Sequence, residues 1–420
     1  MPPFLSRACF TLLVLCAPAA RCRAEDESQR LQAMIDATPM GGELALEPRV
    51  YWCAGLRVHR SLRIIGVAGR TVLHRQVPQP FFLLQGKGAT VSLEGLALEG
   101  GGLDASGVKA VGLGQLRLKA MRVRGCGRVP SGPLPSDRMG ATIDGIYAKD
   151  VDRAVVQGCV LSENARDGFI GIPVRDLAFQ QNLCEGNGRM GATSDVDPEK
   201  KVDGPMKVLY LDNQVRDCGT GGLHVESRPG LPPVEARFEG NLVMDCGSRD
   251  RGYSWGIVLG DHARGLLKGN RVIRTAMGSK IHGYGSGILV GRLGGPARLE
   301  SNWVEESRGS GVTLNACTFP VVLEGNVIRN AGQHGLSAYQ VPGLKLRRNR
   351  VEDAGGSGIW LRLCRDAVLI GNRISRKTPA RERKAAAIQA ELCQGLKLKN
   401  NDLGQGVGLQ LDAASRSTNE

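Results

Sequence analysis

The chain has 420 residues, 58 of them glycine, and its 55 lysines and arginines against 41 aspartates and glutamates give a net charge of +14. Hydrophobic residues make up 42% of the sequence and are spread along it, which excludes an intrinsically disordered chain. The glycines have no period of three, so the chain is not collagen-like. Their number also disfavours most helical folds, because glycine weakens helix interiors.

The first 24 residues have the pattern of a secretory signal peptide. Arg7 precedes the apolar run 8–17, and small residues follow up to Ala24. This run is shorter than the roughly 20 apolar residues that span a bilayer, and no later segment is long enough either. We therefore expect an exported protein, periplasmic or secreted, with no integral membrane segment in the mature chain.

Nine of the 12 cysteines lie after residue 24, and an odd number cannot all pair in disulfides. Cys126, Cys218 and Cys246 share one place in a repeat where alanine or serine stands elsewhere. We expect these cysteines to be small buried residues, with a disulfide between Cys218 and Cys246 as the alternative. The sequence has no Cys-x-x-Cys and no His-x-His motif, which disfavours a structural zinc site.

One pattern recurs from about residue 90. Its core reads apolar-x-apolar-x-Gly-Asn-x-apolar, and Gly-x-Gly-Ile-x-Leu follows after a few polar residues. Alternating apolar and polar positions predict short strands, and a period of 23 to 32 residues indicates a solenoid instead of separate globular domains. The Leu-x-x-Leu-x-Leu frame of a leucine-rich repeat is absent. The recurring asparagines are Asn182, Asn213, Asn241, Asn270, Asn302, Asn326, Asn349, Asn372 and Asn401.

The asparagine series, followed by segments such as 285–289, 309–313 and 356–360, resembles the right-handed parallel β-helix of the pectin-lyase-like superfamily over about residues 40–412. The resemblance implies an all-β solenoid of about 11–12 coils with a short N-terminal capping helix, which the amphipathic pattern places at residues 27–38. It implies no particular activity. The expected organisation is a signal peptide (1–24), cap helix and first strands (25–60), parallel β-helix (61–412) and polar tail (413–420).

In pectin-lyase-like proteins a strand called PB1 lines the substrate groove, and the resemblance assigns PB1 to the Gly-Ile-x-Leu strand. Its isoleucine and leucine point inward, so the intervening residues point outward. Insertions at 127–141 and 195–205 interrupt the regular period, and such loops often border a binding site. We expect the groove to be centred on coils 144–228. The substrate-binding candidates are Glu226, Arg228, Asn315, Tyr339, Trp360 and Arg362.

The first functional hypothesis is a lyase or epimerase acting on a uronic-acid polymer. Removing the proton beside a sugar carboxylate requires neutralising that carboxylate and placing a base near the carbon. The candidate bases are Lys149, His224 and Tyr147. The resemblance also implies calcium or a positive side chain as the neutralising group. Weak candidate Ca²⁺ ligands are Asp195, Asp197 and Asp203, since hard cations take several oxygens, although two lysines lie among them.

Two alternatives remain open. Asp144 and Asp167 both precede a PB1 glycine and stand 23 residues apart, which places two carboxylates one coil apart. Such a pair could serve as acid and base in a glycoside hydrolase, or each aspartate could cap a turn. The third hypothesis is a non-catalytic polysaccharide-binding scaffold.

All three hypotheses take an acidic polysaccharide as partner, because a positive net charge attracts polyanions. Nucleic acid is not an expected partner of an exported protein. We expect the chain to be a monomer.

Overall fold

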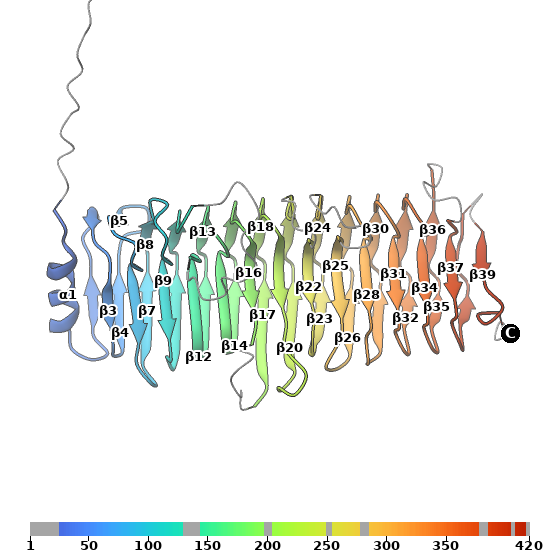
Figure 1. Cartoon of the computed structure of the whole chain (residues 1–420), viewed down its shortest axis with the longest axis horizontal. Coiled ribbons are helices and arrows are strands. Elements are labelled where there is room, and N and C mark those ends of the chain that lie inside the picture. Colours follow the sequence, from blue (N-terminus) through green and yellow to red (C-terminus); the bar gives the residue numbers. More distant parts are fainter. Residues whose placement is uncertain are drawn as a thin grey trace, which may run out of the picture.

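The computed structural model describes residues 25–128, 143–196, 204–248, 254–277, 285–377, 385–404 and 408–416. These residues form a long solenoid with one helix at its N-terminal end (Figure 1). Each coil runs in chain order through three columns of strands, here called PB1, PB2 and PB3, and the strands within a column are parallel. The predicted parallel β-helix with a short capping helix is therefore confirmed, although its coils number 13 by the strands of PB3 among the described residues, more than the 11–12 expected.

PB1 and PB2 form one 26-stranded sheet, and PB3 forms a 13-stranded sheet, counted over the described residues. PB1 contains β3 (Leu56–Val58), β6 (Phe82–Gln85), β9 (Val108–Val111), β12 (Ile146–Gln157), β14 (Phe169–Gln180), β16 (Met190–Ser194), β19 (Gly221–Val225), β22 (Trp255–Leu259), β25 (Ser286–Gly291), β28 (Val312–Asn315), β31 (Leu336–Tyr339), β34 (Ile359–Arg362), β37 (Ile388–Glu391) and β39 (Leu409–Leu411). The two long strands β12 and β14 continue from PB1 into PB2 and join these columns.

PB2 contains, besides the second halves of β12 and β14, the strands β1 (Glu43–Ala45), β4 (Leu62–Ile65), β7 (Thr90–Glu94), β10 (Gln115–Lys119), β17 (Met206–Leu211), β20 (Val234–Glu239), β23 (Ala263–Lys268), β26 (Ala297–Glu300), β29 (Val321–Glu324), β32 (Lys345–Arg347), β35 (Val368–Ile370) and β38 (Lys397–Lys399). PB3 contains β2 (Val50–Trp52), β5 (Thr71–His74), β8 (Leu96–Glu99), β11 (Arg122–Arg124), β13 (Val160–Ser162), β15 (Leu183–Glu185), β18 (Gln214–Arg216), β21 (Leu242–Met244), β24 (Arg271–Ile273), β27 (Trp303–Glu305), β30 (Val327–Arg329), β33 (Arg350–Glu352) and β36 (Arg373–Ser375).

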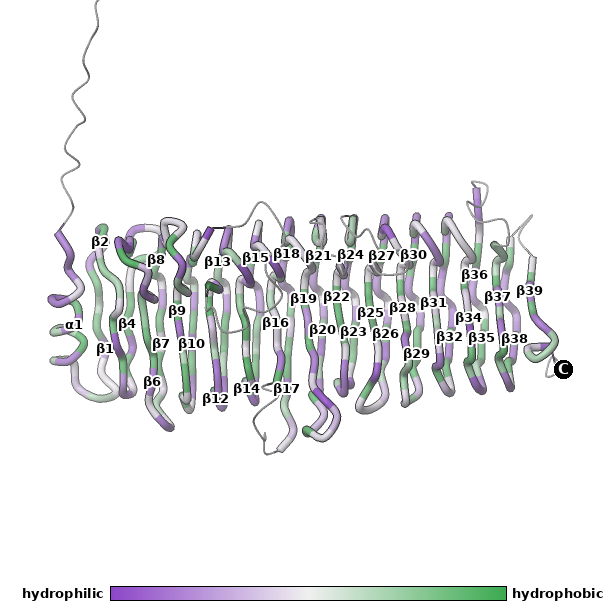
Figure 2. The backbone as a smooth tube through the Cα atoms, in the orientation of Figure 1, coloured by the Kyte–Doolittle hydropathy of each residue, from purple (hydrophilic) through white to green (hydrophobic). Residues whose placement is uncertain are grey.

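The core lies inside the coils, because alternate side chains of every column point inward. The colours along the strands in Figure 2 change accordingly between hydrophobic and hydrophilic. No single coil holds enough apolar surface to bury itself, so stability comes from stacking. In the middle of the stack the fully buried rings of Phe179, Tyr210 and Phe238 follow one another on PB2, with centroids 5.7 and 5.2 Å apart.

The asparagine ladder occupies the turn between PB2 and PB3. The Nδ2 of Asn270 donates to Oδ1 of Asn302 at 2.9 Å and to the carbonyl of Phe238 at 2.8 Å. The backbone N–H of Asn270 donates to the same Oδ1 at 3.0 Å. Equivalent amide-to-amide bonds link each asparagine of the series from Asn182 to Asn401. Buried turn groups that could not reach water are thereby satisfied along the stack.

The described cysteines are free and buried. Cys126, Cys218 and Cys246 are fully buried in a second turn, as expected of small core residues. The alternative disulfide between Cys218 and Cys246 is not formed.

Helix α1 (Ser28–Ala37) covers the N-terminal end of the solenoid, one residue shorter at each end than predicted. Leu31 and Ile35 are buried against the first coil. The side-chain amide of Gln32 accepts the backbone N–H of Arg57 at 2.8 Å and donates to its carbonyl at 3.0 Å. The helix thereby satisfies backbone groups on the otherwise open edge of β3.

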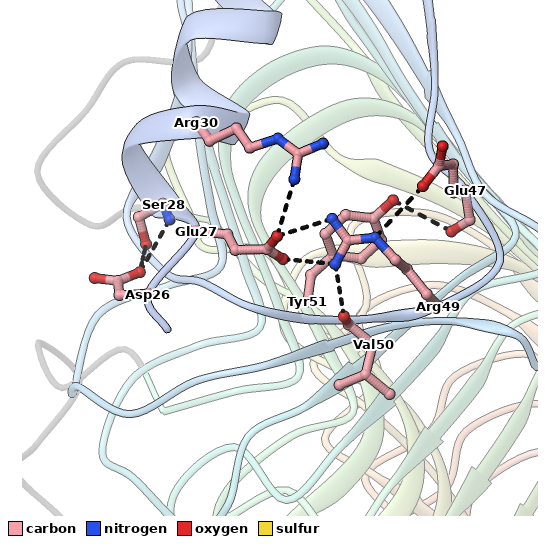
Figure 3. A network of polar contacts seen from close by, with 8 residues as sticks. All are labelled: Asp26, Glu27, Ser28, Arg30, Glu47, Arg49, Val50 and Tyr51. Carbon is pink, nitrogen blue, oxygen red and sulfur yellow. Dashed lines mark hydrogen bonds and ion pairs between the residues drawn. The ribbon is translucent and has the colours of Figure 1, made fainter. Parts of the chain in front are cut away.

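An ion pair attaches the start of α1 to β2 (Figure 3). Arg49 donates two hydrogen bonds to the carboxylate of Glu27, at 2.8 and 2.9 Å, and its guanidinium lies 3.9 Å from the ring centre of Tyr51. Burial opposes ionisation of Glu27, but Arg49 holds the pKa of this carboxyl below its ordinary value. The predicted signal peptide lies outside the described residues. None of the described helices is long and apolar enough to cross a bilayer.

The ladder makes Asn270 a sensitive position. Asn270→Ala leaves the amide of Asn241 and the carbonyl of Phe238 without their partners, so we expect a loss of about 2–4 kcal/mol in the free energy of unfolding. Asn315→Ala is the matched control, because Asn315 is exposed on β28 and lies outside the ladder; its effect should stay within about 0.5 kcal/mol. Urea unfolding followed by circular dichroism measures both. Equal losses would show that the ladder contributes nothing specific.

Candidate functional site

Strand pairing aligns the outward side chains of PB1 coil by coil, in the register expected from the sequence. Tyr147 pairs with Ile170, Ile170 with Thr193, and Thr193 with His224. The same row continues through Val258, Leu289, Thr313, Ser337, Trp360 and Gln389.

The candidate residues fall into three groups along this face. The first is Tyr147 with Lys149 on β12, the second His224 with Glu226 and Arg228 at β19, and the third comprises Asn315, Tyr339, Trp360 and Arg362 on β28, β31 and β34. Three coils separate the first group from the second, and three to five separate the second from the members of the third. At about 4.8 Å per strand these separations are roughly 14 Å and roughly 14–24 Å. The groups therefore cannot act on one sugar carbon, although one polymer chain could touch all three.

The second group, here called the central group, holds a histidine–carboxylate pair. The Nε2 of His224 lies 2.9 Å from Oε1 of Glu226, and the His224 side chain is 15% exposed. The contact falls outside the strict geometry of a hydrogen bond, so the buried Nε2 meets Glu226 as an ion-pair partner. The neighbouring Oγ1 of Thr193 is buried without a hydrogen-bond partner among the described groups. A bound ligand would supply a hydrogen-bond partner for this hydroxyl.

Charges around His224 set its protonation. Burial opposes the charged imidazole, but the carboxylates of Glu226 and Asp195 outweigh burial and raise the pKa of His224 above its ordinary value. Burial also acts to raise the pKa of Glu226, yet His224, with arginines nearby, holds it below its ordinary value. Burial raises the pKa of Asp195. The central group thus combines a titratable imidazole with carboxylates on both of its sides.

Two residues beside the central group were not selected from the sequence. Asp261 and Arg292 form an ion pair, in which Nη2 of Arg292 donates to Oδ2 of Asp261 at 2.7 Å. The charges of Arg292 and of the half-buried Arg228 act to lower the pKa of Glu226. Burial, with the charge of Glu226 added, raises the pKa of Asp261. Asp261 and Arg292 stand in turns with positive φ, so the sequence pattern marks them only as turn residues. Asp261 and Arg292 occupy matching positions on neighbouring coils, and this match is the signal by which the sequence could have revealed the pair.

The first group is a polar patch with an aromatic ring. The Nζ of Lys109, one coil before Tyr147, lies 5.9 Å from the centre of its ring. Tyr147 and Lys149 are both half-buried on the outward face of β12. The first group therefore presents two lysines and one ring to the groove.

The third group is built around a stacked pair of rings. His334 and Trp360 lie 5.3 Å apart between centroids with planes 7° from parallel, and the Nδ1 of His334 accepts the backbone N–H of Ser357 at 3.0 Å. Arg362 is exposed and lies 3.9 Å from the carboxylate of Glu391. On neighbouring coils Tyr339 is half-buried and Asn315 exposed.

The two aspartates of the hydrolase hypothesis lie inside the solenoid. Asp144 and Asp167 are 1% and 0% exposed, and each accepts the backbone N–H of the next coil, Asp167 N at 3.1 Å and Met190 N at 3.0 Å. This is the turn-capping arrangement considered as the alternative. The groove face is out of reach of both carboxylates.

An arginine missed in the sequence accompanies this pair. The Nε of Arg189 donates to Oδ1 of Asp167 at 2.7 Å and its Nη2 bonds the second carboxylate oxygen, while Arg166 lies 3.9 Å from Asp144. Burial acts to raise the pKa of Asp167, but Arg189 holds it below its ordinary value. Burial, with the charge of Asp167 added, raises the pKa of Asp144 to about 7. Arg166 and Arg189 stand 23 residues apart, the spacing that could have revealed them.

A separate groove lies on PB2, across β4, β7, β10 and β12, with a volume of about 570 Å³. Its lining contains the cations Arg63, Arg117, Lys119 and Arg153 and one carboxylate, Glu94, which Arg63 contacts at 2.7 Å and Lys119 at 3.2 Å. This groove therefore also carries positive charge that attracts a polyanion.

The calcium prediction reaches beyond the described residues. Asp195 is half-buried after β16, and its Oδ1 accepts the N–H of Val196 at 2.7 Å. Asp197 and Asp203 lie outside the described residues, as does most of the insertion at 127–141. Within the described ranges, no group of three or more His, Cys, Asp and Glu side chains is placed to hold a metal ion. The calcium site stays a prediction.

A family model described as a right handed beta helix region matches residues 274–419. The chain is a right-handed parallel β-helix protein. The resemblance to pectin-lyase-like proteins is confirmed at the level of the fold. No curated protein sequence matches the chain.

Solved structures resemble this β-helix along most of its length. A PL6 alginate lyase complexed with a trisaccharide aligns with a TM-score of 0.57 and 12% identity, over 94% of this chain and 86% of the other. The periplasmic alginate epimerase AlgG aligns at 0.51 with 11% identity, over 88% and 82%. The catalytic unit of a GH87 alpha-1,3-glucanase from Streptomyces thermodiastaticus aligns at 0.50 with 12% identity, over 93% and 68%. Identities this low show the shared fold alone.

The buried aspartates predict a pH dependence of stability. Because the folded pKa of Asp144 is above its ordinary value, the β-helix binds an extra proton between about pH 4 and 7 and loses stability as the pH rises through this window. Asp144→Asn keeps an acceptor for Asp167 N but cannot ionise. Its free energy of unfolding, taken relative to that of the unchanged β-helix, should therefore be about 2 kcal/mol higher at pH 8 than at pH 5.

Asp167→Asn is the matched variant. It removes the charge that adds to burial in raising the pKa of Asp144, so stability should fall less between pH 5 and 8 than in the unchanged chain. Urea titrations at pH 5 and at pH 8 measure the free energy of unfolding of each variant relative to the unchanged chain. A relative stability of Asp144→Asn that is the same at pH 5 and pH 8 would contradict the assignment of Asp144.

Proposed function

We propose that this β-helix acts on an acidic, uronate-containing polysaccharide by removing the proton next to a sugar carboxylate, as a lyase or an epimerase. The observation that carries the proposal is the central group. The imidazole of His224 stands on the outward face of PB1, with its Nε2 2.9 Å from the carboxylate of Glu226 and with the charges of Asp195 and Arg228 nearby.

The chemistry assigns a part to each residue. Arg228 binds the sugar carboxylate and lowers its charge, so that the neighbouring C–H becomes acidic enough to lose its proton. The neutral imidazole of His224 takes this proton at its second ring nitrogen, and Glu226, which lies against Nε2, stabilises the imidazolium that results. Return of a proton to the opposite face of the carbon gives epimerisation. Loss of the glycosidic oxygen from the adjacent carbon gives the unsaturated product of a lyase.

The outer groups bind the polymer on both sides of this centre. Trp360 offers a ring face to a sugar and Arg362 a cation to a carboxylate, with Asn315 and Tyr339 on the coils before them. Tyr147 and Lys149 lie on the other side, roughly 14 Å from His224 at about 4.8 Å per coil, so we assign them to binding. The net charge of +14 favours a polyanionic substrate.

The comparisons support this class of substrate. Two of the similar structures are named as an alginate lyase and a periplasmic alginate epimerase, and alginate is a polymer of uronic acids. The signal-peptide pattern of residues 1–24 supports export to the periplasm or the medium, where such polymers occur.

The decisive experiment supplies purified β-helix with alginate, pectate and glycosaminoglycans in D₂O, each with added Ca²⁺ or with a chelator. We expect a rise in the ultraviolet absorbance of unsaturated uronate for a lyase, or deuterium at the carbon beside the carboxylate for an epimerase. His224→Gln should lower the rate by at least about 100-fold. His59→Gln, an exposed histidine near the N-terminal end, is the matched control and should retain full activity.

Other outcomes would contradict the proposal. New reducing ends without ultraviolet absorbance or deuterium would indicate a hydrolase. Retention of the polymers in a gel with no reaction would indicate a binding scaffold. Loss of activity in Lys149→Ala together with full activity in His224→Gln would move the base to the first group.

Glu226 predicts the pH profile of the reaction. Because its carboxylate raises the pKa of His224, removing its charge should make the neutral imidazole available at lower pH. Glu226→Gln should therefore shift the acidic limb of kcat/KM to lower pH by about one unit. The profile of kcat/KM between pH 5 and 9 measures the shift. An acidic limb that stays in place would show that another group is the base.

A further inference from the structure

Two pairs of cysteines stand at equivalent places on neighbouring coils. Arg362 pairs with Glu391 in the ladder between β34 and β37, and Arg365 forms a bridge with Gln394 just beyond. Cys364 and Cys393 lie between these two contacts in the same register. Cys218 and Cys246 match in the same way two residues after the pairing of Arg216 with Met244.

This register suits a disulfide. Neighbouring parallel strands lie about 4.8 Å apart, within the range of about 4.4–6.8 Å between the Cα atoms of bonded cysteines. In each pair the two thiols are near enough to influence each other's ionisation. All four cysteines are free in the structure.

We propose that Cys364 and Cys393 are a thiol-oxidation site, which a small-molecule disulfide converts to an intramolecular disulfide while Cys218 and Cys246 stay reduced. The proposal is independent of the proposed function, because neither pair belongs to the groups on the groove face.

The surroundings of the two pairs differ. The neighbouring Cys364 thiol, with a smaller contribution from Ser415, lowers the pKa of Cys393 to about 7, and the Ser415 hydroxyl accepts the backbone N–H of Cys393 at 3.0 Å. Burial raises the pKa of Cys246 well above its ordinary value. The thiolate is the attacking species in disulfide exchange, so Cys393 is the reactive member and Cys246 an inert one.

The position of Cys393 also gives a route for the reagent. Its thiol is buried, but the covering turn 412–416 and the largely exposed strand β39 belong to the last described coil. In solenoids such terminal coils open more readily than central ones, because each coil is held only by its neighbours. Cys218 and Cys246 lie in the middle of the stack.

The oxidation has two balanced steps. The thiolate of Cys393 attacks glutathione disulfide, its S–S bond breaks, and one glutathione leaves as thiolate. Cys364 then loses its proton to water and attacks the mixed disulfide at the Cys393 sulfur, which forms the protein disulfide and releases the second glutathione. The protein loses two electrons and two protons, and one glutathione disulfide becomes two glutathione thiols.

The test incubates the folded chain with glutathione disulfide at pH 7, quenches with acid, and maps non-reduced peptides by mass. We expect one linked peptide joining Cys364 to Cys393, at least about tenfold more abundant than any Cys218–Cys246 link. Cys364→Ser should instead accumulate glutathione on Cys393. Cys218→Ser is the matched control and should still form the Cys364–Cys393 link.

A second measurement separates reactivity from access. Iodoacetamide labelling of Cys393 as a function of pH should have a midpoint near 7 in the unchanged chain and a higher midpoint in Ser415→Ala, whatever the access of the reagent. Cys364 and Cys393 recovered as free thiols, equal oxidation of both pairs, or an unchanged midpoint in Ser415→Ala would each overturn the proposal.

Discussion

Satisfaction of buried backbone groups by the side chain of the neighbouring coil is the interaction on which this β-helix depends. The turn between PB2 and PB3 has N–H and carbonyl groups that no strand pairs. One amide per coil satisfies them: Asn270, for example, accepts the N–H of Asn241 and donates to the carbonyl of Phe238. Because this bond requires the asparagines to stack directly, it fixes the register of every coil between them. Asp144 and Asp167 satisfy backbone N–H groups in the same way on the inner side of PB1.

The fixed register of the coils determines which side chains become neighbours on the groove face. Once the coils stack in line, outward residues of successive PB1 strands form straight rows, and charges far apart in sequence become neighbours. His224 comes to lie beside Thr193 and close to Asp195, and the Asp261–Arg292 pair completes the surroundings of Glu226. The same stacking keeps Lys149 and Trp360 apart from this centre. Under the proposed function, the fold places the three groups along one polymer and gives the central group the features of a base.

The fold could be predicted from the sequence because every coil repeats the same alternation of apolar residues and most coils repeat the same turn asparagine. The asparagine spacing, the inward isoleucine and leucine of PB1 and the capping helix all follow from periodicity and burial. Pairings that occur once are not repeated from coil to coil, and their signal is limited to the equivalent places of the two members on neighbouring coils. The bond from Arg189 to Asp167 and the ion pair of Asp261 with Arg292 join residues of different coils, so their partners depend on loop lengths that the pattern does not determine. The proximity of the Cys364 and Cys393 thiols was missed for the same reason.

The central claim is that the His224–Glu226 pair marks the place where a uronate meets its base. A crystal structure of His224→Gln soaked with uronate oligosaccharides tests it most directly. The account predicts an oligosaccharide along PB1, with one sugar carboxylate at Arg228 and the carbon beside it facing residue 224. An oligosaccharide bound only in the PB2 groove between Arg63 and Arg153, or a PB1 chain whose sugars bypass residue 224, would contradict it.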